Sequence, residues 1–151
     1  MSESRIRRLQ PVLDMALEEE RKAAGMLGKC QQQLEDANAR LRDLNYYADE
    51  YQRGWAERGA QGVNRQWLLN YQQFLGQMQS AVAQQEQTLQ WHEQSVDKAR
   101  ANWQQRYQRV EALRKLIERY REEARVRADK QEQKMLDELS QRAHSVSRRE
   151  S

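Results

Sequence analysis

The fold of this chain is decided by the stretch Gly54-Trp-Ala-Glu-Arg-Gly-Ala-Gln-Gly62, which holds three of the six glycines in 151 residues. Glycine adopts positive φ at no steric cost and weakens a helix interior. Three glycines this close together therefore indicate a reversal of chain direction. The sequence on both sides of the stretch has the apolar spacing of helices. We predict an all-α fold with two long helices in an antiparallel coiled-coil hairpin.

A seven-residue apolar repeat precedes the glycines. Its a positions are Ile6, Leu13, Glu20, Leu27, Leu34, Leu41, Ala48 and Trp55. Its d positions are Leu9, Ala16, Ala23, Cys30, Ala37, Leu44 and Tyr51. Only Glu20 in these two sets is polar, and a repeat sustained over this length is typical of a coiled-coil seam.

The repeat resumes after the glycines. The a positions are Leu68, Leu75, Val82, Leu89, Val96, Trp103, Val110, Ile117 and Ala124. The d positions are Tyr71, Met78, Gln85, His92, Ala99, Arg106, Leu113 and Tyr120. We expect a single coiled-coil domain over 1–151, with helices over about 5–54 and 64–140, a turn over about 55–63, and a frayed tail over 141–151. The second helix would overhang the first.

The pairing register follows from where the turn is centred. A turn centred near Gly59 and Ala60 places Leu41 opposite Met78 and brings Tyr47 together with Phe74 on one edge of the hairpin. A parallel dimer of two chains is the alternative, because heptads alone do not fix helix orientation.

Composition and charge fit a thin seam. The chain is 38% hydrophobic and 32% charged, and its 26 basic residues face 23 acidic ones for a net charge of +3. Such a mixed surface permits nucleic-acid binding but does not indicate it. No apolar run follows Arg5, Arg7 and Arg8, so we expect neither a signal peptide nor a transmembrane helix, and we expect a cytosolic protein. A lone cysteine excludes an intrachain disulfide and fits a reducing compartment.

The sequence predicts no catalytic, cofactor or metal site. No glycine-rich phosphate loop is present, and the two histidines, His92 and His144, lie far apart in the chain. Cys30 and His92 both fall at d positions. We therefore interpret them as seam residues rather than as a nucleophile, a ligand or a switch.

Two surface features are candidate binding sites. The first is the aromatic pair of Tyr47 and Phe74, which would either shield the end of the thin core or dock a partner; both roles stay open. The second is a basic cluster at the open end of the hairpin, comprising Arg5, Arg7, Arg8, Arg114, Lys115, Arg119 and Arg121. Its alternative role is salt-bridge lacing with the acidic residues Glu18 to Glu20, Glu118, Glu122 and Glu123.

The order of four motifs resembles a known family. They are Arg-Leu-Gln-Pro-Val-Leu-Asp-Met-Ala at 8–16, Tyr-Ala-Asp-Glu-Tyr at 47–51, Asn-Tyr-Gln-Gln-Phe at 70–74 and Glu-Gln-Lys-Met-Leu-Asp-Glu at 132–138. Around a glycine turn, and over nearly the whole chain, they are similar to the FliJ family of flagellar type III export proteins.

The resemblance implies a component of the flagellar export apparatus that is active in flagellum biogenesis and motility. Family members are antiparallel two-helix coiled coils that resemble the central stalk of rotary ATPases. They promote assembly and turnover of the hexameric export ATPase, contact the cytosolic domain of the membrane export-gate protein, and bind export chaperones. Localisation would be cytoplasmic, with peripheral association at the inner membrane and no direct insertion.

The resemblance also implies which residues bind these partners. Carried over by position, the gate surface comprises Leu44, Tyr47, Tyr51, Phe74, Met78 and Ala81. The ATPase-contacting ends correspond to Arg5 to Arg8 and to the last third of the second helix, which agrees with the basic cluster. The alternative from the residues alone is a general coiled-coil scaffold or chaperone that stimulates no ATPase.

Overall fold

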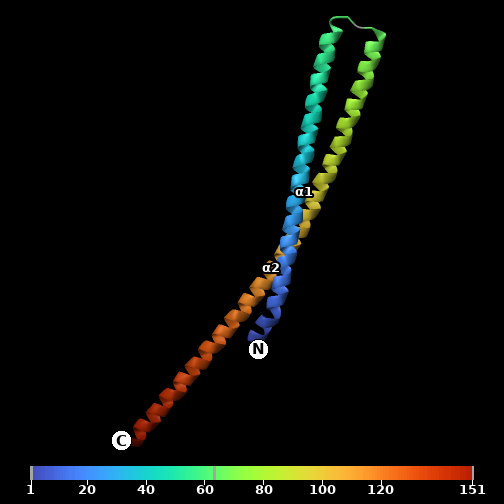
Figure 1. Cartoon of the computed structure of the whole chain (residues 1–151). Helices are drawn as coiled ribbons and strands as arrows, with labels where there is room; N and C mark the ends of the chain where they lie inside the picture. The colour runs from blue at the N-terminus through green and yellow to red at the C-terminus, as the bar shows by residue number, and fades with distance from the viewer. Residues whose placement is uncertain (1, 63, 151) are drawn as a thin grey trace. The chain divides into compact units, whose positions relative to one another are not determined.

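The computed structural model describes residues 2–62 and 64–150, and these form two long α-helices (Figure 1). Helix α1 spans Ser2–Gly59 and helix α2 spans Arg65–Glu150. The described residues contain no strand. The predicted all-α class is confirmed.

The turn lies later in the chain than the sequence predicted. Helix α1 continues through Gly54 to Gly59, and the left-handed conformation that reverses the chain falls at Gly62, whose φ is 114°. Asn64 then caps α2, because its Oδ1 accepts a hydrogen bond of 2.7 Å from the backbone N–H of Trp67. The predicted turn over 55–63 is therefore helical up to Gly59, and residue 63 lies outside the described residues.

Packing explains why Gly54 remains helical. A glycine in a helix interior costs about 1 kcal/mol relative to alanine, which penalises a helix without forbidding it. The next residue, Trp55, packs against two rings of α2, with centroid distances of 5.0 Å to Trp67 and 5.5 Å to Tyr71. Continuing α1 places Trp55 in these contacts, and aromatic pairs of this kind offset the cost of the glycine.

Contacts divide the chain into two compact units. The turn unit is Lys22–Gln104, and the terminal unit combines Met1–Arg21 with Gln105–Ser151. Each unit pairs a segment of α1 with a segment of α2. In the turn unit Ala37 contacts Gln85 and Tyr51 contacts Phe74. Since residue numbers rise along one helix as they fall along the other, the pairing is antiparallel.

The predicted register is wrong by roughly one to two helical turns. In the terminal unit Glu19 pairs with Arg106 and Arg5 with Tyr120, which are further along α2 than a turn centred at Gly59 and Ala60 would place them. The cause is the later turn. Each residue by which the centre of a hairpin moves displaces the facing residue by two.

The positions of the buried hydrophobic side chains were predicted correctly. Every buried hydrophobic side chain in the described residues falls at a predicted a or d position: Leu13, Ala16, Ala23, Ala37, Val96, Ala99, Val110 and Ile117. In the terminal unit four of them form one cluster, Leu13, Ala16, Val110 and Ile117, flanked by Ile6, Leu9, Leu17 and Leu113. Tyr51 and Leu68 depart from the pattern, being 49% and 46% exposed.

Two polar residues at seam positions, Gln85 and Arg106, have hydrogen-bond partners on the other helix. Gln85 is buried and donates its Nε2 to the backbone oxygen of Ala37 at 3.1 Å, which links the two helices of the turn unit. Arg106 lies at a predicted d position, and its guanidinium bonds Glu19 on the other helix at 2.9 Å. A buried or half-buried polar group is tolerated when it is hydrogen-bonded in this way.

The last part of α2 differs from the rest. Every residue over 125–150 is exposed, and α2 remains helical to Glu150, beyond the predicted end near residue 140. Its apolar side chains Met135, Leu136 and Leu139 are each more than half exposed. The division into a single domain stays a prediction.

The antiparallel pairing predicts a short distance within one chain. Asp36 and Thr88 are exposed and line the same cavity of the turn unit. Spin labels at these two positions, in a Cys30→Ser background, should give a short distance by electron resonance that dilution with unlabelled chain leaves unchanged. A parallel dimer would separate labels on one chain by roughly 80 Å, from the helical rise of 1.5 Å per residue.

The seam also predicts a contrast between two valines of α2. Val110 is 2% exposed and Val126 is 38% exposed. Val110→Asp should lower the free energy of unfolding by about 3 kcal/mol or more, because it buries a carboxylate without a partner. Val126→Asp should change it by less than about 0.5 kcal/mol. Urea titration followed by circular dichroism measures both, and equal effects would contradict the seam.

Candidate protein-interaction sites

Aromatic side chains gather on both helices of the turn unit. Tyr51 and Phe74 pack with ring centroids 4.3 Å apart. Beside the turn, Trp67 stacks on Tyr71 at 5.7 Å and both contact Trp55. These contacts join α1 to α2 and stabilise the end of the seam where the chain reverses.

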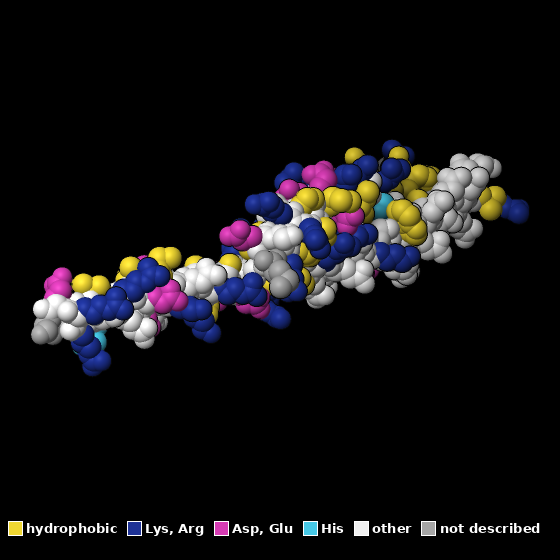
Figure 2. Space-filling view, turned by 90° about the horizontal axis from the view of Figure 1, so that it is seen from below, with side chains coloured by type: hydrophobic (Ala, Val, Ile, Leu, Met, Phe, Trp, Pro, Cys, Tyr) yellow, Lys and Arg dark blue, Asp and Glu magenta, His cyan; other side chains and the backbone are white. Residues whose placement is uncertain are grey.

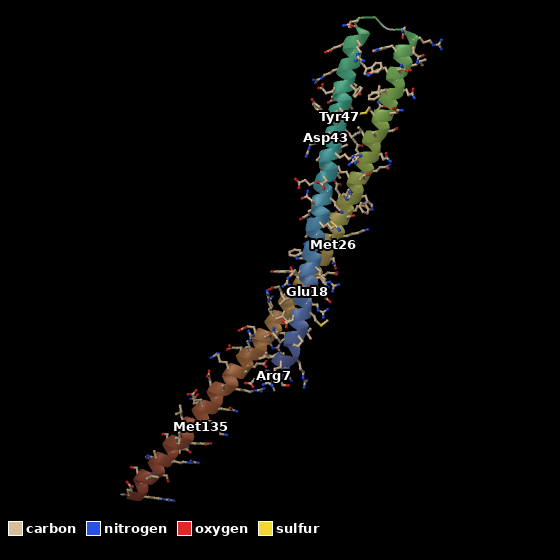
Figure 3. All side chains as sticks on the ribbon, viewed as in Figure 1. Arg7, Glu18, Met26, Asp43, Tyr47 and Met135 are labelled. Carbon is tan, nitrogen blue, oxygen red and sulfur yellow. The ribbon has the colours of Figure 1, made fainter. Side chains whose placement is uncertain are left out.

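The predicted contact between Tyr47 and Phe74 is wrong. Phe74 packs on Tyr51, and Tyr47 contacts the ring of Tyr46 at 5.9 Å on the same helix. The shifted register is the cause, because it places Phe74 opposite a residue of α1 that lies one helical turn nearer to the chain reversal. Tyr47 is thereby left 56% exposed on α1 (Figure 3).

An open groove of about 340 Å³ lies along this part of α1. Its lining residues are Tyr47, Glu50, Tyr51, Gly54, Trp55 and Arg58, all from one helix. Two of the predicted gate-binding residues, Tyr47 and Tyr51, are thus brought together in one surface. The groove has aromatic walls with an acidic and a basic side chain, a combination suited to binding another protein.

The other residues carried over for the gate lie deeper. Leu44, Met78 and Ala81 are half-buried. Met78 lines a separate cavity of about 280 Å³ together with Asn45, Ala48 and Leu75. Among the six predicted residues, Tyr47 and Tyr51 are therefore the exposed ones, while the others are partly occupied by packing within the turn unit.

The basic cluster divides into two kinds of residue. On α2, Arg114 pairs with Glu111 at 3.3 Å, Arg119 with Glu123 at 3.5 Å, and Arg121 with Glu118 at 3.8 Å. All three pairs lie within one helix and remain solvent-exposed, so each contributes little to stability and competes weakly with a partner. Salt-bridge lacing, the alternative role, therefore describes these arginines.

The N-terminal arginines behave differently. The guanidinium of Arg5 lies 5.4 Å from the ring centre of Tyr120, a cation–π contact that fixes the start of α1 beside α2 in the terminal unit. Among the described residues no carboxylate forms an ion pair with Arg7 or Arg8 on α1 or with Lys115 on α2. These side chains are exposed, Arg7 among them in Figure 3. These three residues are the members of the basic cluster whose positive charge is available to a partner.

Further along α2, one arginine holds two carboxylates. Arg125 bonds Glu122 through two nitrogens, at 2.6 and 3.2 Å, and Asp129 at 3.1 Å. The hydrogen bond from Arg125, with its positive charge, lowers the pKa of Glu122 below its ordinary value. Figure 2 shows basic, acidic and apolar side chains interspersed along this C-terminal segment on the visible face. The surface is mixed in charge, as the composition predicted.

The lone cysteine and one of the two histidines lie at predicted seam positions. Cys30 and His92 are half-buried, and His92 contacts the exposed ring of Trp91 at 5.0 Å. Over residues 2–62 and 64–150, no group of three metal-ligating side chains comes together. In that same part of the chain, neither helix has a stretch apolar and long enough to span a bilayer.

Sequence reasoning missed four residues of the groove, Glu50, Gly54, Trp55 and Arg58. Gly54 and Trp55 were assigned to the end of the first helix and to the turn, because the glycine was interpreted as a breaker. The signal that could have found them is their spacing from Tyr47 and Tyr51, which repeats at three and four residues along α1.

Comparison with known proteins identifies a family that this chain resembles. A family model described as "Flagellar FliJ protein" matches residues 4–149. A protein of Escherichia coli (strain K12) named "Flagellar FliJ protein" is 32% identical over 135 residues, which cover 89% of this chain and 92% of that protein. A protein of the same name from Salmonella typhi is 30% identical over the same shares of both chains. Neither name is that of an enzyme.

Proposed function

Because the chain belongs to the flagellar FliJ family, a family related to flagellar export, we propose that it connects the export ATPase to the export gate. The turn unit docks on the cytosolic domain of the membrane gate protein. The terminal unit engages the ATPase hexamer and promotes its assembly and turnover. The observation that carries this proposal is the exposed aromatic surface of Tyr47 and Tyr51 beside the chain reversal.

The gate-docking role is supported by how Tyr47 is held. More than half of its surface is exposed, it lines a groove, and the adjacent Tyr51 is anchored by its packing on Phe74. Tyrosine provides a large contact area at low conformational cost, and such residues often dominate protein interfaces. An exposed aromatic side chain contributes less free energy to packing in the seam than to the binding of a partner.

The ATPase role is supported by the basic cluster. Arg7, Arg8 and Lys115 carry unpaired positive charge in the unit that contains both termini. Charges of this kind accelerate and orient association with a surface of opposite sign, and they do so less at high salt. We propose that they contact an acidic or polar ring of loops on the hexamer.

Export chaperones are the third class of partner that we propose, together with a cytoplasmic location and peripheral association with the inner membrane through the gate. Family membership supports these proposals. The exposed apolar side chains Met135, Leu136 and Leu139 on α2 offer additional contact surface for a chaperone helix. We propose no nucleic-acid partner, because carboxylates neutralise several of the exposed arginines.

A general coiled-coil scaffold or chaperone is the second candidate function. The ion pairs that Arg114, Arg119 and Arg121 make within α2 favour it, because they suit a surface that needs only to stay solvated. Measuring the hydrolysis rate of the purified export ATPase with and without this protein separates the two functions. Stimulation supports the connector, and an unchanged rate supports the scaffold.

Tyr47→Ala should weaken binding to the purified cytosolic gate domain by roughly tenfold or more, because truncating an aromatic anchor costs about 2 kcal/mol. Tyr46→Ala is the matched control, since Tyr46 is adjacent and equally exposed but does not line the groove. Calorimetric titration measures both affinities. Thermal unfolding should be similar for the two variants, and equal gate affinities would contradict docking through Tyr47.

Reversing Arg5, Arg7 and Arg8 to glutamate should raise the concentration that half-maximally stimulates the ATPase by roughly tenfold at low salt, from about 0.5 kcal/mol per charge. The difference should shrink as salt is added, because exposed charges are screened. The control is the same reversal at Arg40, Arg42 and Arg53, three exposed arginines of the turn unit. Equal effects of the two triple reversals would show that only net charge matters.

A further inference from the structure

The exposed end of α2, over 125–150, carries one apolar stripe. Its spacings are close to multiples of the helical repeat of about 3.6 residues, so its members share one face of the helix. They are Ala128, Met135, Leu136, Leu139, Ala143 and Val146. The four largest of these side chains are 54% to 62% exposed. A single chain therefore leaves the stripe uncovered, and a continuous exposed apolar face of this kind marks a contact surface.

Two residues of opposite charge interrupt the stripe, Glu132 and Arg142. Neither forms an ion pair within the part of the chain that the structure describes. Together with the apolar residues they recur at alternating intervals of four and three, which is the a and d spacing of a coiled coil. The series is Ala128, Glu132, Met135, Leu139, Arg142 and Val146.

This series is complementary to itself when it is reversed. The intervals are the same in both directions about a midpoint near Asp137, and reversal exchanges Glu132 with Arg142. In an antiparallel pair of two copies, Glu132 therefore faces Arg142 of the second copy, and Met135 faces Leu139 of the second copy. A two-fold interface requires this reciprocity, because each residue contacts the counterpart of the residue that contacts it.

The same charges oppose a parallel pair. In that arrangement each residue faces its own counterpart, so Glu132 would meet Glu132 and Arg142 would meet Arg142. Like charges brought together in a seam are costly, and a polar residue at a single seam position is known to fix register and orientation. The unpaired charges thus favour the antiparallel orientation.

The stripe begins at the end of the seam between α1 and α2. Ala128 lines an open cavity of about 250 Å³ together with Ser2 and Glu3, the first described residues of α1. All of these residues belong to the terminal unit. A second helix on the stripe would therefore continue along α2 the burial that α1 provides up to this point.

We propose that α2 over 128–146 binds a second copy of this chain as an antiparallel coiled coil. The proposal goes beyond the connector function and does not depend on it. Over this length the coiled coil is short, so the pairing is reversible. Met135, Leu136 and Leu139 are also the side chains proposed to contact a chaperone, and self-pairing and chaperone binding at this stripe would exclude one another.

Reversing either stripe charge tests the proposal. In sedimentation of the full chain with Cys30→Ser, from about 5 to about 500 μM, the parent should change from monomer to dimer. Glu132→Arg and Arg142→Glu should each raise the dissociation constant roughly tenfold or more, because each places like charges opposite one another twice. The matched controls are Asp137→Arg and Lys134→Glu, which make the same charge changes on the opposite face of the helix. They should stay within twofold of the parent.

Mixing the two weakened variants should restore pairing. One then has two positive charges in the stripe and the other has two negative charges, so the mixed dimer has opposite charges in both layers. Its dissociation constant should lie within about threefold of the parent's. Helicity measured by circular dichroism should be the same for all variants. Pairing should also slow amide exchange over 128–146, which is exposed helix in the separate chain.

Three results would overturn the proposal. The first is a parent chain that stays monomeric at the highest concentration; if Leu139→Asp then lowers affinity for a purified export chaperone, the chaperone is the occupant of the stripe. The second is equal dimerisation of the parent and both single variants, which would place self-association elsewhere in the chain. The third is a mixture of the two variants that pairs no better than each variant alone.

Discussion

The structure depends on close packing of small side chains between two helices. Ala16, Ala23, Ala37 and Ala99 are 2–8% exposed, and they let the two backbones in each unit approach closely. An alanine buries little apolar surface, so each layer contributes little and stability accumulates over many layers. Few polar groups can enter so thin a core, and two of them are bonded across it, Gln85 to Ala37 and Arg106 to Glu19.

Because the core is thin, most of the surface of the two helices stays outside it and is available to partners. Near the chain reversal the aromatic rings have two roles. Trp55 and Phe74 pack in the seam. Tyr47 and part of Tyr51 face solvent. In the terminal unit, basic side chains differ in whether a carboxylate pairs with them. Arginines of α2 are neutralised by neighbouring carboxylates on their own helix, whereas Arg7 and Arg8 keep their charge unpaired. Packing within the pair thus determines which groups are available to partners.

The heptad pattern predicted the fold and the buried positions because burial at every seventh residue is a property of the sequence alone. It could not predict the register, which depends on which glycine adopts positive φ, and among the described residues that glycine is Gly62. Gly54 and Gly62 look alike in sequence, and only the packing of Trp55 on Trp67 and Tyr71 keeps the first of them helical. Tyr51 therefore meets Phe74 where Tyr47 was expected. The groove was not predicted for the same reason, because it requires α1 to continue past Gly54.

The last part of α2, over 125–150, has a consequence for how the chain opens. Its residues are all exposed, so its helix is maintained by local bonds such as those of Arg125 with Glu122 and Asp129. Helical segments with few tertiary contacts follow helix–coil statistics and fray from their ends. Amide protons there should exchange through small local openings, with protection falling towards Glu150, whereas those at Ala16 or Val110 should exchange only when the two helices separate. The chain thus combines a cooperative pair of helices with a segment that melts residue by residue.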